Sequence, residues 1–83
     1  MGKSIFTREY GILAATLRQF REEAGVTQVE LAKRLGQTQS FVSKIERGEL
    51  RLDLVQLRRI CGLLGTTLPR FVAMFEKRVQ EKK

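Results

Sequence analysis

The chain contains one cysteine, one proline, and neither histidine nor tryptophan. A lone cysteine, Cys61, cannot form a disulfide within the chain, and without histidine the usual zinc-ligand sets are unavailable. Because the sequence also lacks a nucleophile–base constellation and a phosphate-cradling glycine loop, it argues against an enzyme. Cys61 lies within an apolar stripe, so we expect a small core residue. The sequence predicts no metal and no cofactor.

Long hydrophobic runs are missing as well. No apolar stretch approaches the roughly 20 residues that cross a membrane, and the first residues lack the apolar segment of a signal peptide. We therefore expect a soluble, cytoplasmic protein. What the chain does have is basic charge, with 16 Lys and Arg against 9 Asp and Glu and a formal net charge of +7. Such charge favours nucleic acid as a partner. A membrane-surface role fits poorly, since the helical patterns are short and suited to a core.

Apolar residues recur at helical spacing between glycine-marked breaks, and no sustained period-two alternation appears. The first helix is predicted over residues 9–24, and others are predicted after Thr27, after Thr38, after Asp53 and near residues 67–69. The expected apolar stripes are Leu13, Leu17, Phe20 and Ala24; Leu31, Ala32 and Leu35; Val42 and Ile45; Leu54, Leu57, Ile60, Cys61 and Leu64; and Leu68, Phe71, Val72, Phe75 and Val79. The chain is predicted to be all-α with five helices.

Residues 27–48, TQVELAKRLGQTQSFVSKIERG, are the most informative segment. Thr27 and Glu30 form a capping-box pattern, Gly36 can stop the helix, and Thr38 can cap the next one. With Val42 and Ile45 inward, the outer side of that helix carries Gln39, Ser40, Phe41, Ser43, Lys44 and Arg47. Glutamine can bond adenine bidentately, lysine can donate to guanine, and an apolar side chain can contact a thymine methyl. This face suits a DNA major groove.

The segment resembles the helix-turn-helix of the phage repressor/Cro family, also called XRE-type. The match covers about residues 10–68 and rests on Thr27-Gln28, Glu30-Leu31-Ala32, Gly36, Thr38-Gln39-Ser40, Val42-Ser43-Lys44-Ile45-Glu46 and Gly48. The resemblance implies a compact five-helix, lambda-repressor-like domain with the motif at its second and third helices. We expect an N-terminal arm over residues 1–8, a DNA-binding domain over 9–68 and a C-terminal helix over 69–83. The arm, which contains Ile5 and Phe6, either packs on the core or is loose.

The base-reading candidates are Gln39, Ser40, Ser43, Lys44 and Phe41. Gln39 lies at the helix end that enters the groove, with adenine as the expected partner. Phe41 leaves two alternatives open, because its ring either contacts a thymine methyl or folds back on Val26 and the turn.

Phosphate contacts are expected from Gln28, Arg18, Arg21, Arg47 and Arg51. Gln28 opens a helix, where backbone N–H groups and the helix dipole favour an anion. By resemblance, Gln28 would also brace Gln39, and Arg21 would form a partly buried ion pair with Glu46. A carboxylate near a helix C-terminus is unfavourably placed, which is a physical reason to expect a partner for Glu46. The other edge of Arg21 could still meet a phosphate.

A homodimer is expected through the last helix, with Phe71, Met74, Phe75 and Val79 at the interface; alternatively, these residues close the monomer core. The predicted function is that of a sequence-specific double-stranded DNA-binding transcriptional regulator, repressor-like, acting on a pseudo-palindromic operator with half-sites about one turn apart. The rival is an antitoxin-type or other interaction module that binds a partner protein, with DNA binding secondary. The polar and basic outer face argues against a purely protein-binding role.

Overall fold

The computed structural model describes residues 7–81, which form five α-helices and no strand. The helices are α1 (Arg8–Glu23), α2 (Gln28–Leu35), α3 (Gln39–Glu46), α4 (Leu54–Leu63) and α5 (Leu68–Glu81). The predicted all-α, five-helix fold is confirmed. Residues 1–6 of the expected arm, Ile5 and Phe6 among them, lie outside the described residues. Arg8, the last residue of the expected arm, is the first residue of α1, and Thr7 caps this helix by accepting the Tyr10 backbone N–H.

Short-range polar contacts set the helix limits that the sequence predicted. The Thr27 hydroxyl accepts the Glu30 N–H while the Glu30 carboxylate accepts the Thr27 N–H, which completes the capping box of α2. Thr38 caps α3 through the Phe41 N–H, and Asp53 forms a second capping box at the start of α4. Each cap satisfies backbone donors that have no partner within the first turn of a helix.

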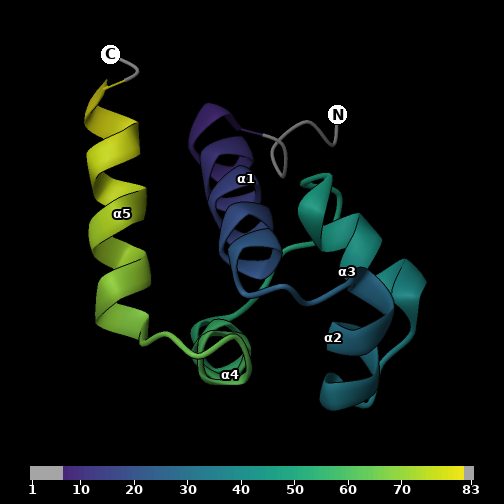
Figure 1. The fold of residues 1–83 in the computed structure, drawn as a ribbon. Helices are drawn as coiled ribbons and strands as arrows, with labels where there is room; N and C mark the ends of the chain where they lie inside the picture. Colours follow the sequence, from purple (N-terminus) through teal and green to yellow (C-terminus); the bar gives the residue numbers. More distant parts are fainter. Residues whose placement is uncertain (1–6, 82–83) are drawn as a thin grey trace.

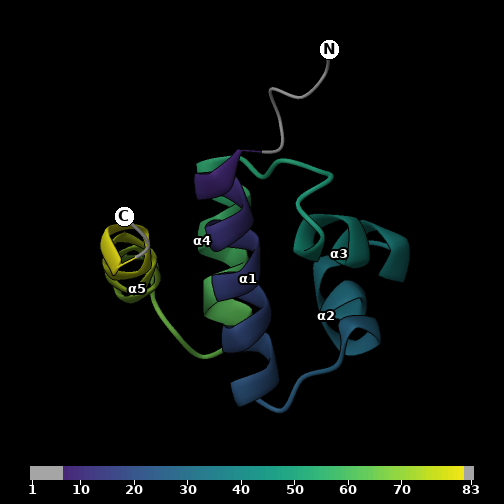
Figure 2. The same ribbon diagram turned by 90° about the horizontal axis from the view of Figure 1, so that it is seen from above.

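Helix α1 lies at the centre of the fold, with the other four helices on its sides and at its lower end (Figure 1). Seen from above, α1 separates α5 on one side from α2 and α3 on the other, while α4 lies beneath α1 (Figure 2). Direct packing joins α1 to α5 and α3, α2 to α3 and α4, and α4 to α5. Two further contacts hold α5 on α1: Arg8 donates to the Val79 carbonyl at 2.8 Å, and Arg78 donates to the Thr16 hydroxyl at 3.4 Å.

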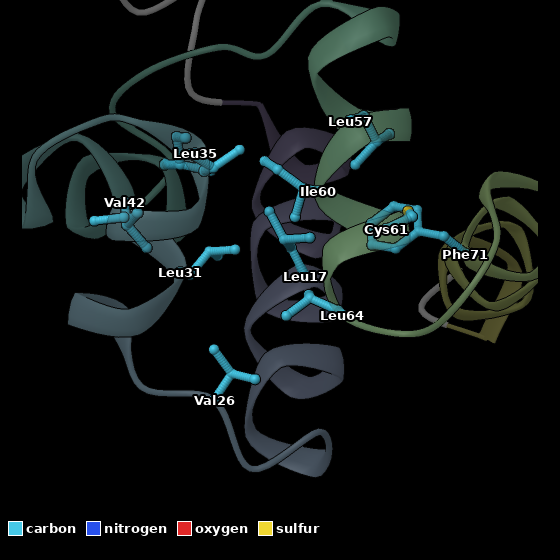
Figure 3. Packing of buried hydrophobic residues seen from close by; sticks show 12 residues of the cluster. Leu17, Val26, Leu31, Leu35, Val42, Leu57, Ile60, Cys61, Leu64 and Phe71 are labelled. Atoms are coloured by element: carbon cyan, nitrogen blue, oxygen red, sulfur yellow. The ribbon is translucent and has the colours of Figure 1, made fainter.

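The core lies where these helices meet, and its side chains come from all five of them (Figure 3). The buried cluster consists of Leu17, Val26, Leu31, Ala32, Leu35, Val42, Ile45, Leu57, Ile60, Cys61, Leu64 and Phe71. Cys61 is fully buried, as predicted, and burial raises the pKa of its thiol. The Phe71 and Phe20 rings pack with centroids 5.5 Å apart.

Three residues of the predicted apolar stripes are solvent-exposed. Ala24 is the C-cap residue of α1, where the chain leaves the helix. Leu54, with 64% of its surface exposed, is the first residue of α4 and precedes the turn that reaches the core. Val72 is also exposed, one position past the buried Phe71. Each position lies at the edge of a buried face, and helical spacing alone does not show which edge positions the rest of the fold covers.

Candidate nucleic-acid interface

The turn between α2 and α3 holds the two helices against each other. Gly36 takes a left-handed conformation with φ of +71°, and the Gln37 N–H donates to the Ala32 carbonyl at 2.9 Å. Glycine is favoured at a position with this left-handed conformation, because glycine has no Cβ to clash with the backbone. Val42 and Ile45 are then buried, which leaves the opposite face of α3 to solvent.

That outer face holds most of the predicted base-reading residues. Gln39, Ser40 and Lys44 are exposed, and Ser43 is partly buried beside them. No acidic side chain lies in the first turn of α3. The face is therefore polar and basic at the end of the helix whose backbone N–H groups and dipole favour an anionic partner.

Beneath this face, Arg21 and Glu46 form a bidentate ion pair. The Nε–Oε2 distance is 2.6 Å and the Nη2–Oε1 distance is 3.1 Å, with side chains only 9% and 3% exposed. The third nitrogen, Nη1, donates to the Val26 carbonyl at 2.8 Å. The hydrogen bonds to Glu46 raise the pKa of Arg21. The pair joins the end of α1, the start of the segment leading to α2, and the end of α3.

Gln28 connects this ion pair to the reading face. Its Nε2 donates to Glu46 Oε1 at 2.9 Å, and its Oε1 accepts from Gln39 Nε2 at 3.3 Å. The Gln28–Glu46 bond was not predicted. One argument could have indicated a second partner for Glu46. A carboxylate has about four acceptor positions, and a bidentate arginine uses only two of them.

The bond to Glu46 has a consequence for Gln39. An ionised carboxylate only accepts hydrogen bonds, so Gln28 must turn its amide nitrogen toward Glu46 and its oxygen toward Gln39. Gln39 then donates one N–H to Gln28 and keeps its oxygen and its second N–H for a ligand. One donor beside one acceptor is the pattern that the major-groove edge of adenine complements.

Phe41 does not stand on the outer face. It is partly buried, packs against the core, and lines a small hollow with Leu35 of α2 and Ile60 of α4. Phe41 precedes Ile45 by one helical turn, so the two side chains share the inner face of α3. The ring therefore packs against the core beside α2 and α4, and its contact with a thymine methyl stays a prediction.

The geometry also removes Arg21 from the set of phosphate contacts, since its side chain is buried and all three of its nitrogens are engaged within the protein. Arg18 is exposed on α1 and pairs with Glu22 at 3.0 Å. Arg47 forms a bidentate pair with Glu49 at 3.0 and 3.1 Å and also donates to the Ser43 hydroxyl. That pairing raises the pKa of Arg47 and lowers the pKa of Glu49.

Arg51 lies in the loop between α3 and α4. Its guanidinium carbon is 4.9 Å from the centroid of the Tyr10 ring. Tyr10 was not among the predicted functional residues, and its contacts with this loop depend on a separation of 40 residues that no local pattern reveals.

The expected dimer residues divide into two groups. Phe71 is 1% exposed and belongs to the monomer core, because its ring is packed on Phe20; its assignment to an interface was wrong. Met74, Phe75 and Val79 are partly buried and leave some apolar surface open on α5.

Within residues 7–81, no group of three or more His, Cys, Asp or Glu side chains is placed to hold a metal ion. In the same range, no helix combines the length and apolar character needed to span a membrane.

Two helices joined by a glycine turn, the second with a polar exposed face, define a helix-turn-helix protein. The family model of the helix-turn-helix domain matches residues 12–71. The chain belongs to this family, in its XRE-type branch.

Individual relatives agree with this assignment. An uncharacterized HTH-type transcriptional regulator of Methanothermobacter thermautotrophicus is 39% identical over 49 residues, which cover 59% of this chain and 71% of the relative. The structure of an XRE-family like protein from Pseudomonas syringae is similar with a TM-score of 0.79 and 41% identity, over 92% of this chain and 93% of that one. A restriction-modification controller protein, C.Esp1396I, gives a TM-score of 0.83 at 25% identity, over 93% and 98% of the two chains.

Proposed function

We propose that this protein is a sequence-specific DNA-binding transcriptional repressor that acts as a homodimer on a pseudo-palindromic operator. Family membership supports the general role of a DNA-binding regulator. The observation that carries the specific proposal is Gln39, which is exposed at the start of α3 with its amide oriented through Gln28 and Glu46.

In this proposal, α3 enters a major groove by its N-terminal end. Gln39 reads adenine, while Ser40, Ser43 and Lys44 contact neighbouring base edges. Gln28 at the start of α2 and the arginines Arg18, Arg47 and Arg51 bind phosphates and set the register of the helix in the groove. The net charge of +7 supports this, because the phosphate contacts supply much of the affinity.

The homodimer is proposed to form through α5, within the C-terminal segment 69–83. The supporting feature is the partly open apolar surface of Met74, Phe75 and Val79, together with exposed Val72. Two copies would place their α3 helices in successive major grooves, about 34–36 Å apart. That spacing would make the operator a pseudo-palindrome with half-sites one helical turn apart.

The test is selection from a randomised duplex pool at near-physiological salt, followed by sequencing of the bound fraction. We expect a pseudo-palindromic motif with adenine at a symmetric position, and loss of that preference in Gln39→Ala. Gln19→Ala, which changes a glutamine on α1 outside both the reading face and the proposed dimer helix, is the matched control and should select the wild-type motif. Absence of an enriched motif, or a motif that Gln39→Ala leaves unchanged, would contradict the proposal.

The oligomeric state is tested separately by sedimentation of the free protein and of the protein with the selected duplex. Two copies per duplex are expected. Met74→Lys should favour the monomer and weaken duplex binding, because a charge would face an apolar interface. One copy per duplex in the wild type would exclude the homodimer while leaving base reading by Gln39 intact.

A further inference from the structure

The segment between α3 and α4, residues 47–53, is held by a side chain from near the start of the sequence. Tyr10 lies in the first turn of α1 and is only 8% exposed. Its hydroxyl donates to the Leu50 carbonyl at 2.9 Å and accepts the Leu52 N–H at 2.9 Å. A phenol has one donor and two acceptor positions, so both bonds form at the same time.

These two bonds flank Arg51 in the sequence. One fixes the backbone before this residue and the other fixes the backbone after it. The ring of the same tyrosine lies under the Arg51 guanidinium, 4.9 Å from centroid to carbon, within the range of a cation–π interaction. Tyr10 therefore restrains both the main chain and the side chain of Arg51.

The hydrophobic neighbours reinforce this arrangement. Leu50 and Leu52 are partly buried and pack against the core, so their side chains turn inward on either side of exposed Arg51. The loop directly follows α3 and carries a cation between two inward-facing residues. A segment ordered before binding loses less conformational entropy when it meets a ligand.

We propose that Tyr10 is a positioning residue for DNA phosphate binding, holding residues 50–52 so that Arg51 is presented to the duplex backbone beside α3. This inference rests on the proposed function. Tyr10 acts through the loop and touches no base, so it contributes affinity without contributing sequence preference.

The decisive variant is Tyr10→Phe, which removes the hydroxyl and keeps the ring. The first measurement is amide hydrogen exchange without DNA, in which the Leu52 N–H should lose protection because its acceptor is gone. The second is titration of the selected duplex at several salt concentrations. We expect affinity to fall by up to about tenfold, the salt slope to decrease by about one phosphate contact, and the selected motif to stay the same.

Two controls separate positioning from general destabilisation. Ile60→Val weakens the buried core and should leave duplex affinity and the salt slope unchanged under conditions where the protein is folded. Arg51→Ala should reduce affinity and the salt slope on its own. If Tyr10 acts through Arg51, the double variant will bind no more weakly than Arg51→Ala alone, so the two effects will not add.

Three outcomes would overturn the proposal. Wild-type affinity and salt slope in Tyr10→Phe would show that the loop needs no such restraint. Tighter binding would show that the ring withholds Arg51 from DNA instead of presenting it. Absence of duplex binding by the wild-type chain would overturn the proposed function together with this inference, whereas the other two results would overturn the positioning role alone.

Discussion

The amide nitrogen of Gln28 lies 2.9 Å from the Glu46 carboxylate, and this bond joins the buried Arg21–Glu46 pair to the exposed side chain of Gln39. Glu46 therefore has two structural roles. It neutralises a buried arginine, and it determines which end of the Gln28 amide faces the proposed reading residue.

Glu46→Gln should be strongly destabilising. The substitution leaves the Arg21 guanidinium buried without its counter-charge, and breaking a buried pair in this way costs about 3–5 kcal/mol. Urea unfolding followed by circular dichroism measures the change in unfolding free energy. Glu22→Gln is the control, because that carboxylate is exposed and should have little effect on stability. An equally small effect in Glu46→Gln would show that the buried pair contributes no net stability.

Gln28→Ala tests the orientation of Gln39 with a smaller disturbance of the fold. Without the Gln28 oxygen, the Gln39 amide is free to rotate and to present donor and acceptor in either order. The preference for adenine should broaden, with a loss of discrimination within the roughly 1–3 kcal/mol of a good bidentate contact. Selection from a randomised duplex pool checks this, with Gln19→Ala again as control. A motif as sharp as that of the wild type would mean that the brace is unnecessary.

Glu49→Gln should strengthen duplex binding. Glu49 holds Arg47 in a bidentate pair on the exposed surface, so in the free protein this carboxylate competes with phosphate for the guanidinium. Removing the charge frees Arg47, and the salt slope should steepen by about one contact. Fluorescence anisotropy at several salt concentrations measures both quantities.

The matched control for that experiment is Glu23→Gln, which removes the same charge from the exposed end of α1, outside the proposed dimer helix. A general gain in positive charge would strengthen binding equally in both variants. A gain confined to Glu49→Gln identifies release of Arg47 as the cause, and weaker binding would indicate that Glu49 itself contacts the duplex.

The alkaline limit of stability should depend on Tyr10. Burial raises the pKa of its phenol, although the Leu52 hydrogen bond and Arg51 lower it in part. Because the folded-state pKa is above the unfolded value, the stabilisation is fully present below about pH 10 and is lost as pH rises through the folded-state pKa. A phenolate can no longer donate to the Leu50 carbonyl.

Tyr10 is the single tyrosine of the chain, so tyrosinate absorbance follows this titration directly. We expect a midpoint above the value for unfolded protein, together with loss of protection at the Leu52 amide over the same pH range. Tyr10→Phe has no phenol to ionise and should lack that pH dependence at Leu52. A midpoint at or below the unfolded value would contradict the effect of burial.

Several features of this protein followed from the sequence alone. Thr27, Thr38 and Asp53 cap helices, and Gly36 ends one, because these signals act over three or four residues and need no distant partner. The same is true of five inward positions, which helical periodicity predicted: Leu31, Ala32 and Leu35 on α2, and Val42 and Ile45 on α3. The family resemblance rested on these local features, and the roles assigned to Gln39, Ser40, Ser43 and Lys44 are still predictions.

The tertiary structure decided the contacts between residues that are far apart in the sequence. Periodicity placed Leu54 in a stripe and Phe41 on the outer face, but burial depends on whether a neighbouring helix covers the position. Leu54 is 64% exposed, while partly buried Phe41 lies beside Leu35 of α2 and Ile60 of α4. The Gln28–Glu46 bond and the hold of Tyr10 on the loop around Arg51 span 18 to 42 residues. Such contacts arise only when packing of the core brings separate helices together, because no short-range pattern encodes the partner of a side chain across the fold.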